Sequence, residues 1–382
     1  MSGWRIVSRT EPREWGSVVI FAVAFALSLL ICALLLAVQG KDGLGGIGLL
    51  LSGGFGHLYS YGETLLKAIP IFLCSLGVAL CFRLQVWNIG AEGQYVIGTL
   101  GGCWFALSFP GLPVWLMMPG MLASAMLAGG LWAAVAAVLR QRWGMNEIIS
   151  TLMLNYIGIE ILKHLIYGPW KDPAGMNFPV SPYFAESAII GPVWNPDFWT
   201  GIGLSDGIVD TLAQLFGRAH WGILSCLIAG ALCSFFLRKG MRGFEITAAG
   251  SNAKAARFAG IPYSRLVVLV MFVCGALAGL AGMQETSATL NRLEPHIVVG
   301  YGYTAVVVAW LAKLRTMRIA FFAFILAGLR VGVENLQLEL QISSSFANTL
   351  EGIILITVLA GQFFNDYAIR RKPRQSVPGA GV

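Results

Sequence analysis

Long runs of apolar residues alternate along this chain with short polar segments, and most of the runs are about 20 residues long. A helix of that length crosses the hydrocarbon core of a bilayer, whereas a membrane β-barrel would show short segments of alternating polarity. The pattern therefore predicts an all-α integral membrane protein, a polytopic helical bundle of about ten spans, within a range of eight to ten. The predicted spans are 17–39, 64–83, 91–108, 113–139, 147–167, 220–238, 264–284, 300–312, 319–337 and 349–366.

The eighth run, 300–312, is too short to cross the bilayer as a straight helix, so it predicts a broken or re-entrant segment. A polar stretch that contains glycine, "ATLNRLEPHIVVG", precedes this run, and a second one, "CFRLQVWNIGAEG", leads into the run at 91–108. With ten spans, the two stretches would begin on opposite sides of the membrane. This arrangement predicts an inverted repeat, in which paired broken segments mark the translocation pathway.

The composition agrees with a membrane protein, because 57% of the 382 residues are hydrophobic and only 12% are charged. A soluble domain has about 25% charged residues. The net charge of +7 could suggest nucleic-acid binding, but the basic residues fall in short loops between apolar runs. Such loops set membrane orientation. Their distribution predicts that the N- and C-termini are both cytoplasmic.

The spans and loops predict one transmembrane domain, 17–366, between a cytoplasmic N-terminal segment, 1–16, and a basic cytoplasmic tail, 367–382. A long outside loop, 168–219, is rich in Pro and Trp. Because Trp favours the headgroup level, this loop is expected to pack as a lid or interfacial element. The largest cytoplasmic loop is 239–263. The glycine-rich segment 40–48 is expected to be a flexible outside loop.

Polar side chains at Asn88, Glu92 and Gln94 stand where the third span begins. A carboxylate inside a bilayer costs about 2.5–3.5 kcal/mol on insertion scales, so it is a functional hypothesis by default. Two interpretations stay open: these side chains brace a broken helix, or they contact a polar solute. The candidate residues of the translocation pathway are Asn88, Gly90, Glu92, Gly93, Gln94, Asn155, Gly300, Tyr301, Gly302 and Tyr303.

The cytoplasmic loop contains the stretch "GFEITAAGSNAKAARFAGI", which predicts a short helix with a face of small alanines. Ser251 or Asn252 can cap this helix, and Gly260 followed by Pro262 would end it. A helix of this kind suits docking into a cleft on another protein. A plain interfacial connector is the alternative.

This loop resembles the coupling helix of ABC importer permeases. The stretches "WNIGAEGQYVIGTLGG", "NEIISTLMLNYI", "CGALAGLAGMQE" and "GYGYTAVVVAWLAK" also resemble that family in this order. Together they identify residues 60–365 as similar to the nucleoside and simple-sugar branch of the branched-chain amino-acid/ribose permease superfamily. One departure is the basic loop after "WLAK", where family members often have an uncharged small residue and another glycine. That difference puts the details of ATPase docking in doubt.

The resemblance implies a permease subunit that forms half of a translocation pathway for nucleosides or related simple sugars. It also implies three partners, namely a cytoplasmic ABC ATPase, a second homologous permease or a second copy of this chain, and an extracytoplasmic substrate-binding protein. The residues implied in coupling to the ATPase are Glu245, Gly250, Asn252, Lys254, Ala255, Ala256, Arg257, Ala259 and Gly260.

The chain contains no Gly-x-x-x-x-Gly-Lys-Ser/Thr motif, so ATP and Mg²⁺ are expected on the partner ATPase. No nucleophile motif or acid–base pair stands out, and the histidines and cysteines share no ligand spacing. We therefore expect no catalytic residue, bound cofactor or metal. Glu160 and Lys163, three residues apart, are expected to form an ion pair rather than a proton relay. An ion-gradient-driven secondary transporter is the alternative function, and it would need ion ligands in its own pore.

Overall fold

The architecture is helical throughout the spans, and the computed structural model describes residues 4–8, 14–194, 200 and 205–371. These residues form two units, Met1–Leu50 with Val333–Val382, and Leu51–Gly332. Eight of the described helices are long and apolar enough to cross a membrane. The chain is therefore a multi-pass helical membrane protein, as the hydropathy pattern predicts.

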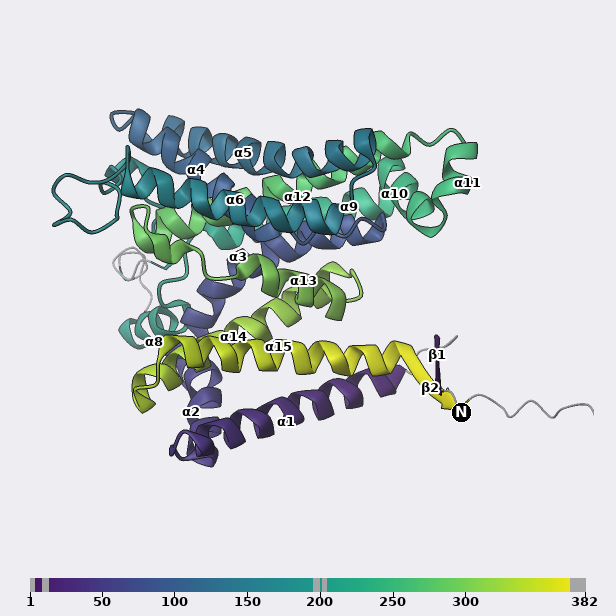
Figure 1. Ribbon diagram of the computed structural model, residues 1–382. Coiled ribbons are helices and arrows are strands. Elements are labelled where there is room, and N and C mark those ends of the chain that lie inside the picture. Colours follow the sequence, from purple (N-terminus) through teal and green to yellow (C-terminus); the bar gives the residue numbers. More distant parts are fainter. Residues whose placement is uncertain (1–3, 9–13, 195–199, 201–204, 372–382) are drawn as a thin grey trace, which may run out of the picture. The chain divides into compact units, whose positions relative to one another are not determined.

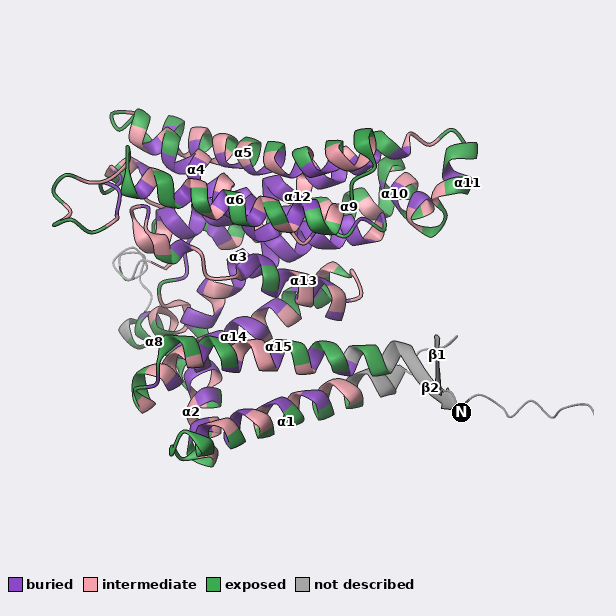
Figure 2. Cartoon of the chain, in the orientation of Figure 1, coloured by how far each residue is buried: buried purple, intermediate pink, exposed green. Residues whose placement is uncertain are grey.

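Two deeply buried helices, α3 (Leu58–Arg83) and α12 (Tyr263–Glu285), form the centre of the larger unit. Figure 2 shows both mostly in the colour of buried residues, whereas α5 (Val114–Trp143) has an exposed outer face. Two glycines of α12 allow close approach, since a Cβ on Gly279 or Gly275 would overlap the backbone of α5. Small residues in membrane helices permit such packing.

Three more long helices belong to the larger unit, and a fourth runs from the larger unit into the smaller one. The three are α4 (Ala91–Ser108), α6 (Glu147–Tyr167) and α9 (Gly222–Lys239), and the fourth is α14 (Thr316–Leu340). The eighth run is α13 (Tyr301–Leu311), whose 11 residues are too few to cross a bilayer, as expected. Asn146 caps the start of α6, because its Oδ1 accepts a hydrogen bond from the Ile148 amide at 2.8 Å.

In the smaller unit, α1 (Glu14–Val38) and α15 (Ser344–Asp366) pack side by side and antiparallel, as Figure 1 shows. Beyond these helices, β1 (Trp4–Ser8) and β2 (Tyr367–Arg371) form an antiparallel ribbon in which Ile6 pairs with Ile369. The sequence analysis did not predict this ribbon. It holds the beginning and the end of the described chain at the same end of this unit.

The expectation of a flexible loop over 40–48 is wrong, because α2 (Gly43–Phe55) begins inside it. The left-handed turn is confined to Gly40, with φ of +73°, and the Leu44 amide donates to Asp42 Oδ1 at 3.1 Å. Glycine weakens a helix by about 1 kcal/mol relative to alanine. In an apolar medium, however, an unsatisfied backbone group costs several kcal/mol, so the helix forms.

The long segment 168–219 packs within the larger unit. Its first half pairs with the chain before α13, since the Ser181 amide donates to the Leu293 carbonyl at 3.0 Å. It contains the short helix η1 (Glu186–Ala188) and, near its end, α8 (Asp206–Phe216), which packs on α3. Arg218 then makes two hydrogen bonds to Glu63 of α3, at 2.9 and 2.7 Å. Most of the Trp- and Pro-rich stretch 195–204 lies outside the described residues.

Candidate functional site

The chain leaves helical geometry between α3 and α4, over residues 84–90, and side chains satisfy the freed backbone groups. The Ile89 carbonyl accepts from Asn155 Nδ2 at 2.9 Å, and the Ile89 amide donates to Thr151 Oγ1 at 3.3 Å. The Gly90 amide donates to Asn88 Oδ1 at 2.9 Å. Non-helical backbone at membrane depth requires such partners. The break lies slightly earlier than residues 88–94, where the polar side chains first suggested it.

The Glu92 carboxylate holds the start of α13. It accepts from the Gly300 amide at 2.9 Å and from the Gly302 amide at 2.7 Å, although these residues are 208 and 210 positions away. The first amides of a helix have no partner within the helix, and its N-terminus favours a negative charge. Glu92 therefore acts as a helix cap supplied by another helix. Gly302 permits this approach, because a Cβ there would overlap the Glu92 backbone.

The remaining amide side chains of the region complete the network. Asn88 and Gln94 exchange hydrogen bonds at 3.1 and 3.0 Å, and the Gly93 amide donates to Asn155 Oδ1 at 2.8 Å. We call Asn88, Glu92, Gln94 and Asn155 the break cluster. Its four side chains are at most 2% exposed. Buried polar networks that are fully satisfied rigidify the structure around them.

A second break, over residues 286–300, separates α12 from α13. It contains a π-turn at Thr286–Leu290 and left-handed residues at Asn291 and Gly300, with φ of +58° and +86°. Arg330 of α14 donates to the Val299 carbonyl at 2.5 Å and lies 4.8 Å from the centre of the Tyr301 ring. The structure thus brings together the two polar stretches that the sequence marked separately. Their relation by an inverted repeat stays a prediction.

The two tyrosines at the start of α13 have different surroundings. Tyr301 is buried, at 2% exposure, and its ring packs edge-on against Tyr95. Tyr303 is 38% exposed, and its hydroxyl accepts from Asn155 Nδ2 at 3.3 Å. Among the pathway candidates with side chains, Tyr303 is therefore the one that presents an aromatic face next to the break cluster.

The predicted cytoplasmic helix is a pair of helices, α10 (Met241–Ser251) and α11 (Ala253–Phe258), which we call the coupling element. Asn252 separates them, and its Oδ1 accepts from the amides of Lys254 and Ala255 at 3.1 and 3.0 Å. This confirms Asn252, and not Ser251, as the cap of α11. Gly260, with φ of +79°, ends the element.

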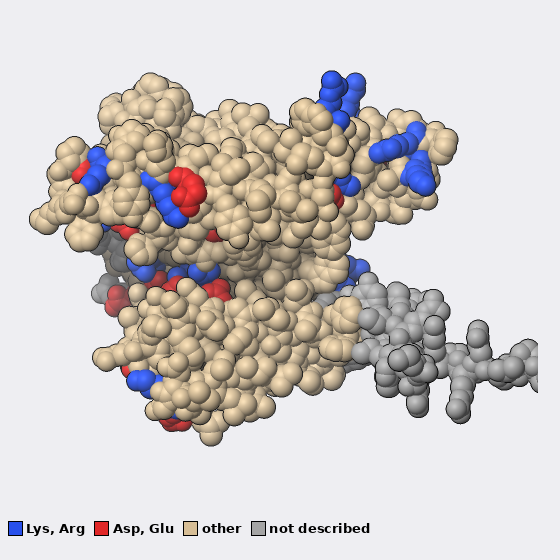
Figure 3. All heavy atoms as spheres, viewed as in Figure 1, with Lys and Arg blue, Asp and Glu red and all other residues tan. Residues whose placement is uncertain are grey.

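The coupling element exposes most of the residues named for it. Lys254, Ala255, Arg257, Ala259 and Gly260 are exposed, whereas Ala256 is buried and Glu245 forms an ion pair with Arg242 at 2.8 Å. Figure 3 shows Lys and Arg side chains at this end of the bundle.

Two aromatic residues were missed, namely Phe258 at 94% exposed and Phe244 at 66% exposed. Each is a phenylalanine among small and charged residues, and this pattern could have indicated an exposed aromatic side chain.

Close packing connects the coupling element to α3. A Cβ on Gly250 would overlap the Arg83 carbonyl at the end of α3, so only glycine fits at that contact. Arg83 Nη2 in turn donates to the Leu314 carbonyl, just after α13, at 2.6 Å. The coupling element, the end of α3 and the end of α13 are therefore joined by direct contacts.

The histidines do not converge in the described part of the chain, where no group of three metal-ligating side chains occurs. His220 lies between α8 and α9, and its Nδ1 accepts from the Gly222 amide at 3.0 Å. Burial lowers the pKa of His220 to about 4, so this imidazole is neutral at pH 7. The Glu160–Lys163 ion pair forms as expected, at 2.7 Å, on an exposed face of α6.

Comparison with known proteins gives a consistent result. The family described as "Branched-chain amino acid transport system / permease component" matches residues 60–359. A glucose ABC transporter permease of Haloferax volcanii is 31% identical over 307 residues, which cover 80% of this chain and 78% of the relative. A guanosine ABC transporter permease of Bacillus subtilis is 30% identical over 349 residues, or 91% of this chain and 93% of the relative.

A nucleoside ABC transporter permease of Lactococcus lactis is 30% identical over 311 residues, which cover 81% of this chain and 82% of the relative. No solved structure matches the chain. The matched range runs from the beginning of α3 into α15, so it contains both breaks and the coupling element. The chain belongs to the permease component family of branched-chain amino acid transport systems, and it is a permease subunit of an ABC transporter.

Proposed function

We propose that this chain forms half of the translocation pathway of an ABC importer for nucleosides, with related simple sugars as the second substrate class. The relatives named for guanosine and nucleoside transport align with 91% and 81% of the chain. The relative named for glucose transport aligns with 80% and supports the sugar class. The alternative of an ion-gradient-driven transporter has no support among these relatives.

The observation that carries the proposal is the coupling element. Phe258, Ala255 and Arg257 are exposed on a capped helix, while Gly250 fixes the preceding helix against the end of α3. A short helix with an exposed aromatic residue beside small ones fits a cleft on a partner protein. In this proposal the ATPase receives that face, and its closure on ATP moves α3 and α13 through the Arg83 contacts.

The break cluster serves as a brace in this mechanism, and Tyr303 contacts the solute. Both oxygens of Glu92 already accept backbone amides, and Asn88 and Gln94 satisfy each other. Tyr303 has an exposed face, and an aromatic ring stacks well on a nucleobase or on the apolar face of a sugar. A permease that a binding protein supplies needs little solute affinity of its own.

We propose that both termini are cytoplasmic. The pairing of β1 with β2 supports a common side of the membrane for these two strands. The excess of Lys and Arg in the loops on that side makes it cytoplasmic. The basic residues of the 239–263 loop favour a cytoplasmic coupling element as well, and the partner ATPase that docks there would bind ATP and Mg²⁺. The remaining partners are an extracytoplasmic substrate-binding protein and a second homologous permease or a second copy of this chain.

Uptake of labelled nucleosides, nucleobases, ribose and galactose tests the proposal in cells that lack this chain and in cells that regain it. Loss of nucleoside uptake on deletion, restored by the wild-type chain and abolished by ATP depletion, is the expected result. Uptake that survives ATP depletion and stops with a protonophore would replace the proposal with secondary transport. Loss of sugar uptake alone would move the substrate to the second class.

A further inference from the structure

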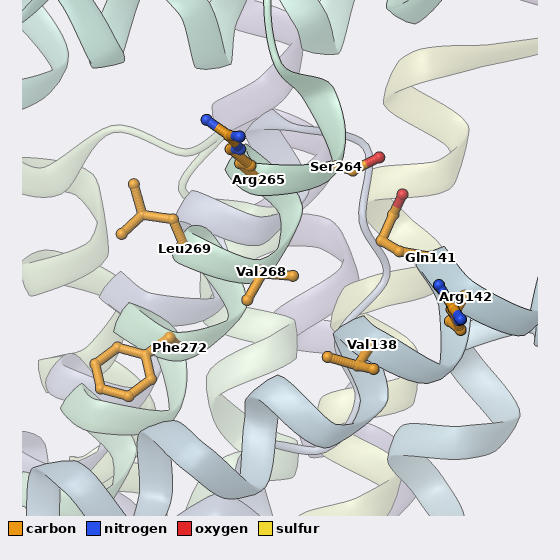
Figure 4. Close-up of a pocket in the computed structure, with 8 residues that line it drawn as sticks. All are labelled: Val138, Gln141, Arg142, Ser264, Arg265, Val268, Leu269 and Phe272. Carbon is orange, nitrogen blue, oxygen red and sulfur yellow. The ribbon is translucent and has the colours of Figure 1, made fainter.

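An open groove of about 600 Å³ lies between the end of α5 and the beginning of α12. Figure 4 shows its two walls, with Arg142 and Gln141 on α5 and Arg265 and Leu269 on α12. Nothing in the pathway or the coupling element uses this groove. The groove is lined by Val138, Gln141, Arg142, Ser264, Arg265, Val268, Leu269 and Phe272.

The two arginines lie on opposite walls of the groove, with Ser264 and Gln141 between them, as Figure 4 shows. Arg142 is in the last turn of α5, and Arg265 is the third residue of α12, so both stand where spanning helices reach the headgroup region. Their side chains are exposed, and neither makes an ion pair within the part of the chain that the structure describes. No carboxylate lines the groove. Two basic residues close to them in the sequence have partners within the chain. Arg140 pairs with Glu147 at 2.9 Å, and Arg257 lies 5.2 Å from the Tyr263 ring centre.

Beyond the arginines and the polar side chains of Gln141 and Ser264, the groove is lined by apolar residues and runs along the membrane-spanning part of the helices. From Ser264 to Phe272, α12 advances by eight residues, or roughly 12 Å at the helical rise. Val138 and Leu269 are 44% and 40% exposed on the two walls. A groove that is cationic at the headgroup level and apolar below matches a molecule with an anionic head and a hydrocarbon chain.

We propose that this groove binds an anionic phospholipid, with its phosphate between Arg142 and Arg265 and an acyl chain along Val138, Val268, Leu269 and Phe272. Two arginines attract anionic headgroups, and the volume lies within the range of small-molecule sites. A second copy of the chain fits less well. A two-fold interface here would place these arginines against the same arginines of the partner, and like charges across an interface cost several kcal/mol.

Native mass spectrometry of the full-length protein in detergent tests the proposal, by titration with dioleoyl-phosphatidylglycerol and, separately, dioleoyl-phosphatidylcholine. We expect the first phosphatidylglycerol to bind at least roughly tenfold more tightly than phosphatidylcholine. The double variant R142Q/R265Q should weaken phosphatidylglycerol binding by roughly 25-fold, because each arginine near an anionic surface contributes a factor of about five. The matched control R238Q/K239Q removes two charges from the end of α9, outside the groove, and should leave the affinity within about twofold.

Two further arms separate the lipid from other ligands. Leu269→Trp fills the apolar part and keeps both charges, so it should weaken both lipids, with thermal unfolding as the check on folding. Glycerol 3-phosphate should not displace phosphatidylglycerol. Equal affinities for the two lipids, unchanged selectivity in R142Q/R265Q, or displacement by glycerol 3-phosphate would each overturn the proposal. A dimer that R142Q/R265Q stabilises or dissolves would instead assign the groove to a subunit interface. None of these readouts depends on transport.

Discussion

The break cluster and the coupling element belong to the same unit, yet the exposure of their side chains is opposite. The four polar side chains of the break cluster are at most 2% exposed, and they bond to each other and to freed backbone groups. In the coupling element, by contrast, Phe258 is 94% exposed. The comparison teaches that the buried Glu92 carboxylate supports the fold, whereas the exposed Phe258 ring is available to the partner proposed above.

Glu92→Gln tests the supporting role of the break cluster most directly, and we expect it to cause the largest loss of stability. Hydrogen bonds to a charged group contribute about 1.5–3 kcal/mol each, and the new amide would point a donor at a backbone amide. The variant should lose about 3 kcal/mol or fail to fold, as measured by thermal unfolding in detergent. Glu160→Gln is the matched control on an exposed ion pair and should cost no more than about 1 kcal/mol. A stable Glu92→Gln protein with weakened solute binding would assign Glu92 to the solute instead.

Gly250→Ala tests the contact between the coupling element and the end of α3, and it should have the next largest effect. The added methyl group meets the Arg83 carbonyl, which is backbone and cannot turn away, so overpacking should cost about 1–3 kcal/mol. Uptake should fall together with the ATPase rate of the assembled transporter. In Gly352→Ala, a glycine of α15 with open space around it, the same change should be neutral or stabilise by up to about 1 kcal/mol. Normal uptake by Gly250→Ala would show that the contact between Gly250 and Arg83 does not transmit motion from the ATPase to α3.

Phe258→Ser should change partner binding without changing stability. The ring makes little contact within this chain, so the free energy of unfolding should stay within about 0.5 kcal/mol. Copurification of the ATPase should drop by at least roughly tenfold, as expected for a central aromatic contact of an interface. Phe178→Ser, at a residue that is 68% exposed in the 168–219 segment, should leave the ATPase bound. Loss of the ATPase in both variants would point to general damage.

The smallest effect is expected from Asn252→Ala, which removes the cap of α11. Loss of an N-cap costs about 1 kcal/mol, so the amides of Lys254 and Ala255 should exchange hydrogen roughly fivefold faster. Asn252→Ser, which keeps a capping oxygen, should restore the slow rate. Unchanged exchange in Asn252→Ala would mean that packing alone holds the helix.

Much of the fold follows from local sequence. Apolar runs predicted the long helices to within a few residues, and Asn252 and Gly260 were expected at helix boundaries that the structure contains. These features succeed because they depend on side chains within one or two turns of the position concerned.

Other features depend on distant residues and could not be predicted. The acceptor role of Glu92 requires Gly300 and Gly302, and β1 exists only because a segment beyond residue 366 pairs with it. In α2, glycine content suggested a loop, but the demand for backbone hydrogen bonds in an apolar medium decided the outcome. How far Phe258 is exposed could not be predicted, because the sequence does not show whether a phenylalanine in a short helix faces the rest of the chain.

The link between Glu92 and α13 also has a consequence for biosynthesis. A ribosome adding about 5–20 residues per second needs roughly 10–40 s to make the 208 residues that separate Glu92 from Gly300. During that time α4 has left the ribosome while the amides that receive its carboxylate do not yet exist. Until α13 is made, the Glu92 carboxylate lacks its two amide partners, so the newly made first half depends on the second half for this contact.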